Sequence, residues 1–120
     1  ATVIPGFTDS HFHLTNLGKQ LDTLQLKDCK SPHEVAEKIL KKSANINQND
    51  WIIGFGWDHN KWYEPHFPKA EILNSLPISQ PIMLNRIDGH SAWVNQKAME
   101  LSQLDVTSIP PDGGDIINDL

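Results

Sequence analysis

The sequence predicts an α/β fold in which parallel strands alternate with crossover helices. Three short apolar segments that suit buried strands occur in order, at residues 3–7, 51–58 and 81–87. A stretch with helical spacing or a helix-capping signal follows each of them, and this alternation is typical of parallel strands joined by helices. At 120 residues the chain is long enough for one domain with a core and too short for two.

Composition and charge favour an ordinary globular protein. Hydrophobic residues make up 38% of the chain and charged residues 21%. The net charge of −5, with no basic cluster, argues against nucleic acid or an anionic membrane surface as the main partner. No apolar run approaches the ~20 residues of a membrane span. Cys29 is the single cysteine, so no internal disulfide can form, and we expect the cytoplasm or another reducing compartment.

The firmest local signal marks the start of the first helix. Ser31 can cap it, Pro32 suits its first position, and Glu34 can reach back to complete a capping box. Apolar residues then recur at helical spacing, and the polar cluster at residues 45–50 ends the helix. The segment before it, residues 15–30, is mixed in character and predicts a loop with a short helix or an extended piece.

Two further pairs of strand and helix are predicted after residue 50. We expect strands at residues 51–58 and 81–87 and helices at residues 69–76 and 95–104, the last of them capped by Asn95. The tail that follows contains turn signals and no further core.

Two histidines follow the first predicted strand. Successive strand side chains point to opposite faces, so Asp9, His11 and His13 share one face. Two imidazoles about 6.6–7 Å apart along a strand can converge on one divalent cation. Two partly buried histidines bonded to the backbone are the alternative, and the position at the end of a buried strand favours the metal. We expect Asp9 to orient a histidine by a hydrogen bond rather than to bind metal.

The other two strands also end in polar groups, at Asp58 and at His90. In parallel α/β folds functional groups gather at the carboxyl ends of the strands, so the three segments together predict one site. Simpler roles stay open. Asp58 can belong to a strand-end turn, and Trp57 and Trp62 are more often packing residues than the wall of a substrate pocket. A turn explains His90 as well as a role as hydrogen-bond donor, acid or base does.

These segments resemble a known family. Residues 3–14 resemble the first barrel strand of the amidohydrolase superfamily. Residues 51–58, 86–95 and 111–114 resemble the amidohydrolase family 3 branch, which includes N-substituted formamide deformylases. The motifs occur in the order of that family and extend over essentially the whole chain.

The resemblance implies a metal-dependent hydrolase with a TIM-type (β/α)₈ barrel, of which this chain would hold about three strand–helix units. It implies that His11 and His13 bind a divalent metal, usually zinc. The metal activates a water for attack on a carbon–nitrogen bond of the non-peptide amide type. It also implies that Asp58, His90 and Trp93 lie on the side of a small-molecule substrate.

Residues 1–120 are then expected to form a single partial domain, the N-terminal portion of such a barrel, because the later ligands of the family have no counterpart here. A start without Met and the uncapped residues 116–120 also favour a piece of a longer protein. We expect this fragment alone to be inactive, and its open edges and apolar faces to allow a homo-oligomer.

Two other classes of protein compete with this hydrolase. One is a non-catalytic binding or assembly module that keeps the barrel fold without its chemistry. The other, a dinucleotide-binding protein, is disfavoured because residues 54–56 (Gly-Phe-Gly) lack the third glycine of the phosphate fingerprint.

Overall fold

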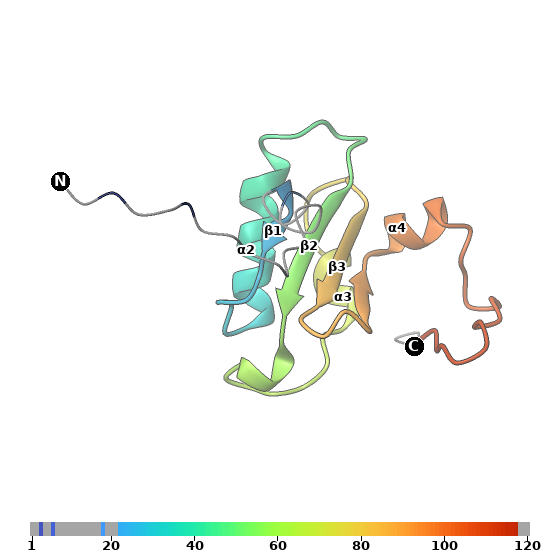
Figure 1. Ribbon diagram of the computed structural model, residues 1–120. Helices are drawn as coiled ribbons and strands as arrows, with labels where there is room; N and C mark the ends of the chain where they lie inside the picture. The colour runs from blue at the N-terminus through green and yellow to red at the C-terminus, as the bar shows by residue number, and fades with distance from the viewer. Residues whose placement is uncertain (1–2, 4–5, 7–17, 19–21, 118–120) are drawn as a thin grey trace.

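A mixed four-stranded sheet organises the chain (Figure 1). The computed structural model describes residues 3, 6, 18 and 22–117. The strands lie side by side in sequence order: β1 (Leu24–Gln25), β2 (Ile52–Trp57), β3 (Ile82–Arg86) and β4 (Ala92–Val94). The first three strands are parallel, and β4 pairs with β3 in the antiparallel direction. The α/β class is therefore confirmed.

The all-parallel sheet is the part of the expectation that is wrong. A tight turn follows β3, in which Arg86 N–H donates to the Ser91 carbonyl at 2.8 Å and Gly89 has a φ of +73°. A connection this short can only join antiparallel strands, so the chain returns as β4 instead of crossing over through a helix. The sheet of a (β/α)₈ barrel is parallel throughout, and the barrel remains a prediction.

The strand at the other edge of the sheet comes from the segment that the sequence left ambiguous. Leu24 and Gln25 of β1 pair with Gly54 and Phe55 of β2. The strand predicted at residues 3–7 lies outside the described residues, apart from Val3 and Gly6.

Helix α2 (Pro32–Ser43) begins where the capping signal predicts it. Ser31 Oγ accepts the Glu34 N–H at 3.2 Å, and the Glu34 carboxylate accepts a backbone N–H at 2.9 Å. That N–H belongs to Lys30, one residue before the one that a standard capping box uses. The buried side of the helix carries Val35 and Ile39, both fully buried.

The later helices are shorter than predicted. The second is α3 (Ala70–Asn74), and the last is α4 (Gln96–Leu101). The expected cap of α4 is confirmed, because Asn95 Oδ1 accepts the Ala98 N–H at 3.0 Å. Gln103 has a left-handed φ of +57°, which ends the helix before Leu104. No described helix is long and apolar enough to cross a membrane.

The two faces of the sheet differ. Helices α2 and α3 pack on one face, where Ile52, Ile82 and Leu84 are fully buried. Gly54 lies on this face because a Cβ there would come within 2.6 Å of Leu84 Cδ2. We call the opposite side the open face; its side chains are all at least partly exposed, and they are Gln25, Ile53, Phe55, Met83, Asn85, Ala92 and Val94.

Candidate functional site

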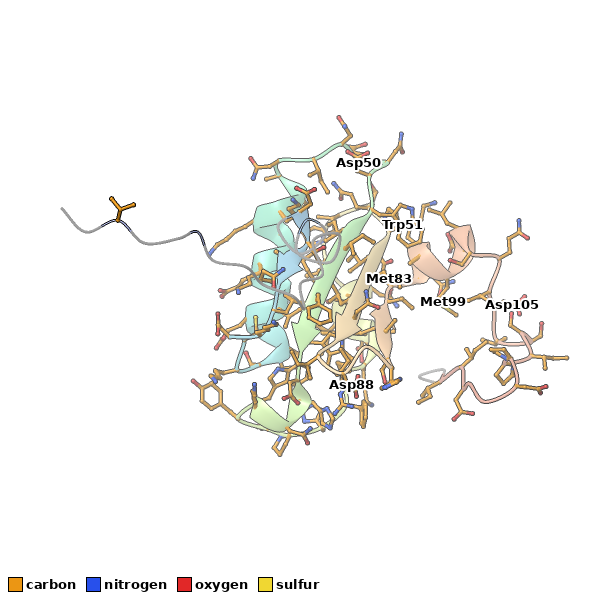
Figure 2. The ribbon with its side chains drawn as sticks, viewed as in Figure 1. Asp50, Trp51, Met83, Asp88, Met99 and Asp105 are labelled. Carbon is orange, nitrogen blue, oxygen red and sulfur yellow. The ribbon has the colours of Figure 1, made fainter. Side chains whose placement is uncertain are left out.

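An aromatic cluster lies at the carboxyl ends of β2 and β3, and Trp57 is at its centre. The ring centroid of Trp57 is 6.1 to 6.4 Å from those of four other residues: Trp62, His59, Phe67 and Trp93. Together with Arg86, these residues form what we call the strand-end cluster. Figure 2 shows Asp88 at this end of the sheet, with Asp50 and Trp51 at the opposite end.

An irregularity in β2 turns Trp57 into this cluster. Strict alternation from Ile53 and Phe55 would place Trp57 on the open face. The register instead shifts between Phe55 and Trp57, where Gly56 takes a φ of +97° that favours glycine. Trp57 therefore points to the helix-covered side, where it is 1% exposed and its Nε1 donates to the Leu84 carbonyl at 2.8 Å.

Arg86 brings a positive charge into the cluster from the end of β3. Its guanidinium carbon lies 5.9 Å from the Trp57 ring and 5.7 Å from the Phe67 ring, distances suited to cation–π attraction. Its Nη1 donates to the Asp88 carboxylate. The backbone N–H of His90 also donates to Asp88, at 3.0 Å, and this bond, with Arg86 adding to it, lowers the pKa of the Asp88 carboxyl.

Three polar atoms of the strand-end cluster are buried without a hydrogen-bond partner in the described part of the chain. They are His59 Nδ1, Trp62 Nε1 and Arg86 Nε. Leaving such an atom unpaired costs roughly 1–3 kcal/mol. The Trp and Arg nitrogens can only donate hydrogen bonds. These two donors therefore need acceptor atoms, such as the oxygen of a water or of a carbonyl.

Asp58 lies beside the cluster and caps a short turn. Its carboxylate accepts the backbone N–H and the side-chain amide of Asn60, both at 3.1 Å, and lies 4.0 Å from Lys61 Nζ. These bonds organise the 3₁₀ helix η1 (His59–Lys61), as expected of a strand-end turn. The predicted contact between Asp58 and a substrate remains a prediction.

The structure places the other two predicted substrate-side residues in contrasting environments. Trp93 is 5% exposed, packs against Trp57, and donates its Nε1–H to the Lys69 carbonyl at 3.0 Å. His90 is exposed in the turn between β3 and β4. Of the two, His90 has the side chain that can reach a ligand without rearrangement of the core, and both substrate roles remain predictions.

The predicted metal ligands His11 and His13, with their partner Asp9, lie outside the described residues, so their roles also remain predictions. Within residues 22–117 and the three isolated described positions, no group of three or more His, Cys, Asp or Glu side chains is placed to hold a metal ion. The donor chemistry of two imidazoles suits zinc.

The sequence analysis missed Arg86 and Phe67 as members of the site. Arg86 ends a buried strand, where a charged side chain needs a partner, and the preceding loop is rich in aromatic rings. Those two signals together could have identified the pair. The ring of His59 stacks on Phe67 with centroids 4.2 Å apart, so His59 belongs to the cluster as well as to the turn.

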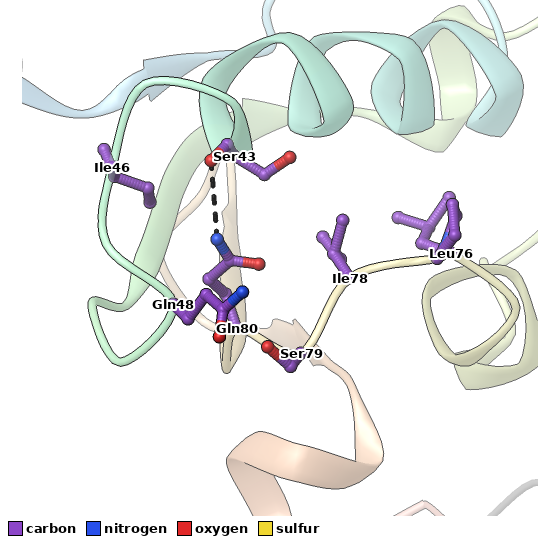
Figure 3. A pocket seen from close by; sticks show the side chains of 8 residues that line it. Ser43, Ile46, Gln48, Leu76, Ile78, Ser79 and Gln80 are labelled. Atoms are coloured by element: carbon purple, nitrogen blue, oxygen red, sulfur yellow. Dashed lines mark hydrogen bonds between the residues drawn. The ribbon is translucent and has the colours of Figure 1, made fainter.

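A groove of about 630 Å³ opens at the opposite, amino ends of the strands (Figure 3). Its walls come from residues 43–48 and 76–80, and the side chain of Gln80 crosses it to donate to the Ser43 carbonyl at 3.4 Å. No titratable side chain lines the groove. It therefore offers no acid or base that could activate the hydroxyls of Ser43 and Ser79, and the carboxyl ends of the strands remain the candidate site.

Comparison with known proteins agrees with the family that the sequence resembles. The amidohydrolase family model matches residues 1–119. The Bacillus subtilis protein YtcJ, which is named as an amidohydrolase, is 32% identical over 119 residues, 99% of this chain and 22% of its own length. The N-substituted formamide deformylase of Arthrobacter pascens is 29% identical over 124 residues, again 99% of this chain and 22% of its own.

Two solved structures share the fold. They are uncharacterised metal-dependent hydrolases from Pyrococcus horikoshii and Pyrococcus furiosus, each with a TM-score of 0.63 and 30% identity. The first match covers 90% of this chain and 20% of that structure, and the second covers 96% and 23%. The chain thus spans about a fifth of the length of the relatives it matches.

Proposed function

The chain belongs to the amidohydrolase family, and from this premise we propose that the whole protein is a metal-dependent hydrolase of non-peptide carbon–nitrogen bonds. The observation that carries the proposal is the match over residues 1–119, together with the fold shared with two metal-dependent hydrolases. The similarity to an N-substituted formamide deformylase supports small amide-type molecules as the substrate class.

In this proposal His11 and His13 hold the divalent metal, with zinc the first candidate, and Asp9 orients one of the two imidazoles. The bound metal would supply an activated water and polarise the carbonyl of the substrate. We assign these ligands to the first strand of a (β/α)₈ barrel. The mixed sheet β1–β4 follows that strand in the sequence, and the carboxyl ends of β2 and β3 contribute to the substrate side.

The chain's own groups on the substrate side are an exposed imidazole and a set of unpaired donors. His90 can donate a hydrogen bond to a carbonyl or serve as an acid or base. The buried N–H groups of Trp62 and Arg86 lack acceptors among the described residues, which favours a group bearing oxygen atoms at this edge. Trp93 and Asp58 support the edge from inside, through the indole packing and the capped turn.

Residues 1–120 supply two of the metal ligands that the family uses, and we propose that they are inactive on their own. A metal that activates water needs a complete ligand set and a group to move the proton. The buried thiol of Cys29, free in the described structure, supports the reducing cytoplasm as the place of action.

Hydrolysis by the whole protein tests the proposal. N-substituted formamides and other small amides are assayed before chelation, after it, and after a divalent metal is restored. We expect chelation to abolish turnover, the restored metal to recover it, and His90→Gln to lower kcat/KM at unchanged metal content. The matched control is His66→Gln, in the exposed loop. Turnover that survives complete removal of metal, or robust turnover by the isolated 120 residues, would contradict the proposal.

A further inference from the structure

The open face of the sheet carries a contiguous apolar row. Ile53 on β2 pairs with Met83 on β3, and Met83 pairs with Val94 on β4, so the three side chains lie next to one another. Ile53 is 37% exposed, and Met83 and Val94 are partly exposed. On the helix-covered face the corresponding residues are fully buried. Among the described residues, one side of this sheet is therefore packed and the other is partly exposed.

The open face also lacks ionisable side chains. Its polar members are Gln25 and Asn85, neither of which carries a charge, and Lys27 lies at its rim with Nζ 5.5 Å from the Phe55 ring. This lack of charge contrasts with a chain that has ten basic and fifteen acidic residues. Contiguous apolar surface without charge is typical of an interface rather than of a solvated face.

A second observation is that residues 1–120, which we call the module, also expose apolar side chains away from the sheet. Apolar side chains after α4 are largely exposed in the described structure: Val106 is 68% exposed, Ile109 is 89% exposed and Ile117 is 85% exposed. Figure 1 shows this segment running away from the sheet. The module thus exposes apolar groups on its open face and again along the tail.

We propose that the open face is the surface on which this module packs against the remainder of the hydrolase chain. The inference rests on the proposed function, since it takes the whole protein to have the length of its relatives. This chain spans about a fifth of that length, so most of the polypeptide that could cover the face lies outside it. The occupant must be apolar and uncharged opposite Ile53, Met83 and Val94, with its charges limited to the rim near Lys27.

Cysteine labelling in the whole protein tests this inference. In a Cys29→Ala background, Ile53→Cys and Met83→Cys report on the open face, and Glu37→Cys on the exposed side of α2 is the matched control. We expect maleimide to label the two open-face cysteines at least about tenfold more slowly than the control, because burial limits reaction to transient openings. Equal rates would overturn the proposal.

The same variants in the isolated 120 residues identify the occupant. We expect Ile53→Cys and Met83→Cys to react there within about threefold of Glu37→Cys at every protein concentration. Slow labelling at all concentrations would mean that the chain covers its own face, and slow labelling only at high concentration would mean a second copy; either result overturns the proposal. Leu84→Cys tests whether the isolated residues are folded, because Leu84 is fully buried in the folded sheet. If this cysteine labels fast, the isolated residues have unfolded, and the labelling rates in the whole protein alone decide whether the proposal holds.

The labelling result is separable from the proposed function because it does not depend on metal. An open face that labels freely in a protein with full metal content and turnover would overturn the docking inference alone. A protected face in a protein that neither binds metal nor hydrolyses amides would overturn the proposed function alone.

Discussion

The two ends of the sheet differ in the hydrogen bonding of their buried polar groups. At the amino end Asn95 is 6% exposed, and its side chain accepts the N–H groups of Ile82 at 2.9 Å and Ala98 at 3.0 Å. It also donates to the Gln80 carbonyl at 3.0 Å. At the carboxyl end, three buried nitrogens of the strand-end cluster have no partner among the described residues. Within the described residues, the buried side chain of Asn95 is fully bonded at the amino end, whereas the donors of Trp62 and Arg86 at the carboxyl end lack acceptors.

This difference separates a structural edge from a candidate functional one. Native folds pair nearly all their buried polar groups, so unpaired ones gathered in one place call for an explanation. In α/β sheets ligands bind beyond the carboxyl ends of the strands. The unpaired donors of Trp62 and Arg86 lie at that edge, and the fully bonded Asn95 lies at the opposite one.

Removal of Asn95 should give the largest effect. Asn95→Ala removes the cap of α4 and leaves the Ile82 N–H and the Gln80 carbonyl without their bonds in the interior, whereas the Ala98 N–H keeps its bond to the backbone carbonyl of residue 95. We expect a loss of about 3 kcal/mol in the free energy of unfolding. Urea denaturation measures it. The control is Asn45→Ala, whose exposed side chain donates to the Lys41 carbonyl at 2.9 Å. We expect that control to change stability by less than about 0.5 kcal/mol. Equal losses for the two variants would contradict the role of Asn95.

A matched pair of tryptophan substitutions compares paired and unpaired indoles within the strand-end cluster. Trp93→Phe breaks the bond to the Lys69 carbonyl, whereas Trp62→Phe breaks none in the described structure. Both lose similar volume in the core. We expect Trp93→Phe to cost about 1 kcal/mol more than Trp62→Phe in urea denaturation of the 120 residues. A larger cost for Trp62→Phe would show that its indole already has an acceptor.

The smallest effect concerns pH and the turn that holds Arg86. The folded-state pKa of Asp88 lies below its usual value, first because of the His90 backbone N–H and then because of Arg86. Its ionised form therefore adds stability above the ordinary Asp pKa, and this contribution is lost as pH falls through that value and then through the lower folded one.

Asp88→Asn should reduce the fall in stability at acid pH, measured by denaturation along a pH series. His90→Ala is the control, because it keeps the backbone N–H that is the main cause. A pH profile in which His90→Ala has the full effect of Asp88→Asn would assign the shift to the imidazole instead.

Local signals explain which parts of the fold the sequence could predict. The Ser31 and Asn95 caps need only residues a few positions away, so both helix starts are confirmed. Apolar runs in the sequence predict strands β2 and β3. Strand β4 has three residues and depends on pairing with β3, which no local pattern in residues 92–94 reveals.

The site was harder to predict because it depends on contacts between segments. Trp57 joins the cluster through a register shift at Gly56, and strict alternation would have placed it on the other face. Arg86 becomes a site residue through rings that come from β2 and from the loop after it. His11 and His13, the residues with the clearest chemical pattern, lie outside the described part, so their role is still a prediction from sequence.

Metal content of the whole protein tests the proposed centre most directly. Elemental analysis after purification without added chelator should find a divalent metal, zinc first, in near-stoichiometric amount. We expect His11→Ala combined with His13→Ala to lose it. His33→Ala, an exposed imidazole on the first turn of α2, should keep it. Near-stoichiometric metal in the double variant, or none in the unmodified protein, would contradict a metal centre built on these two histidines.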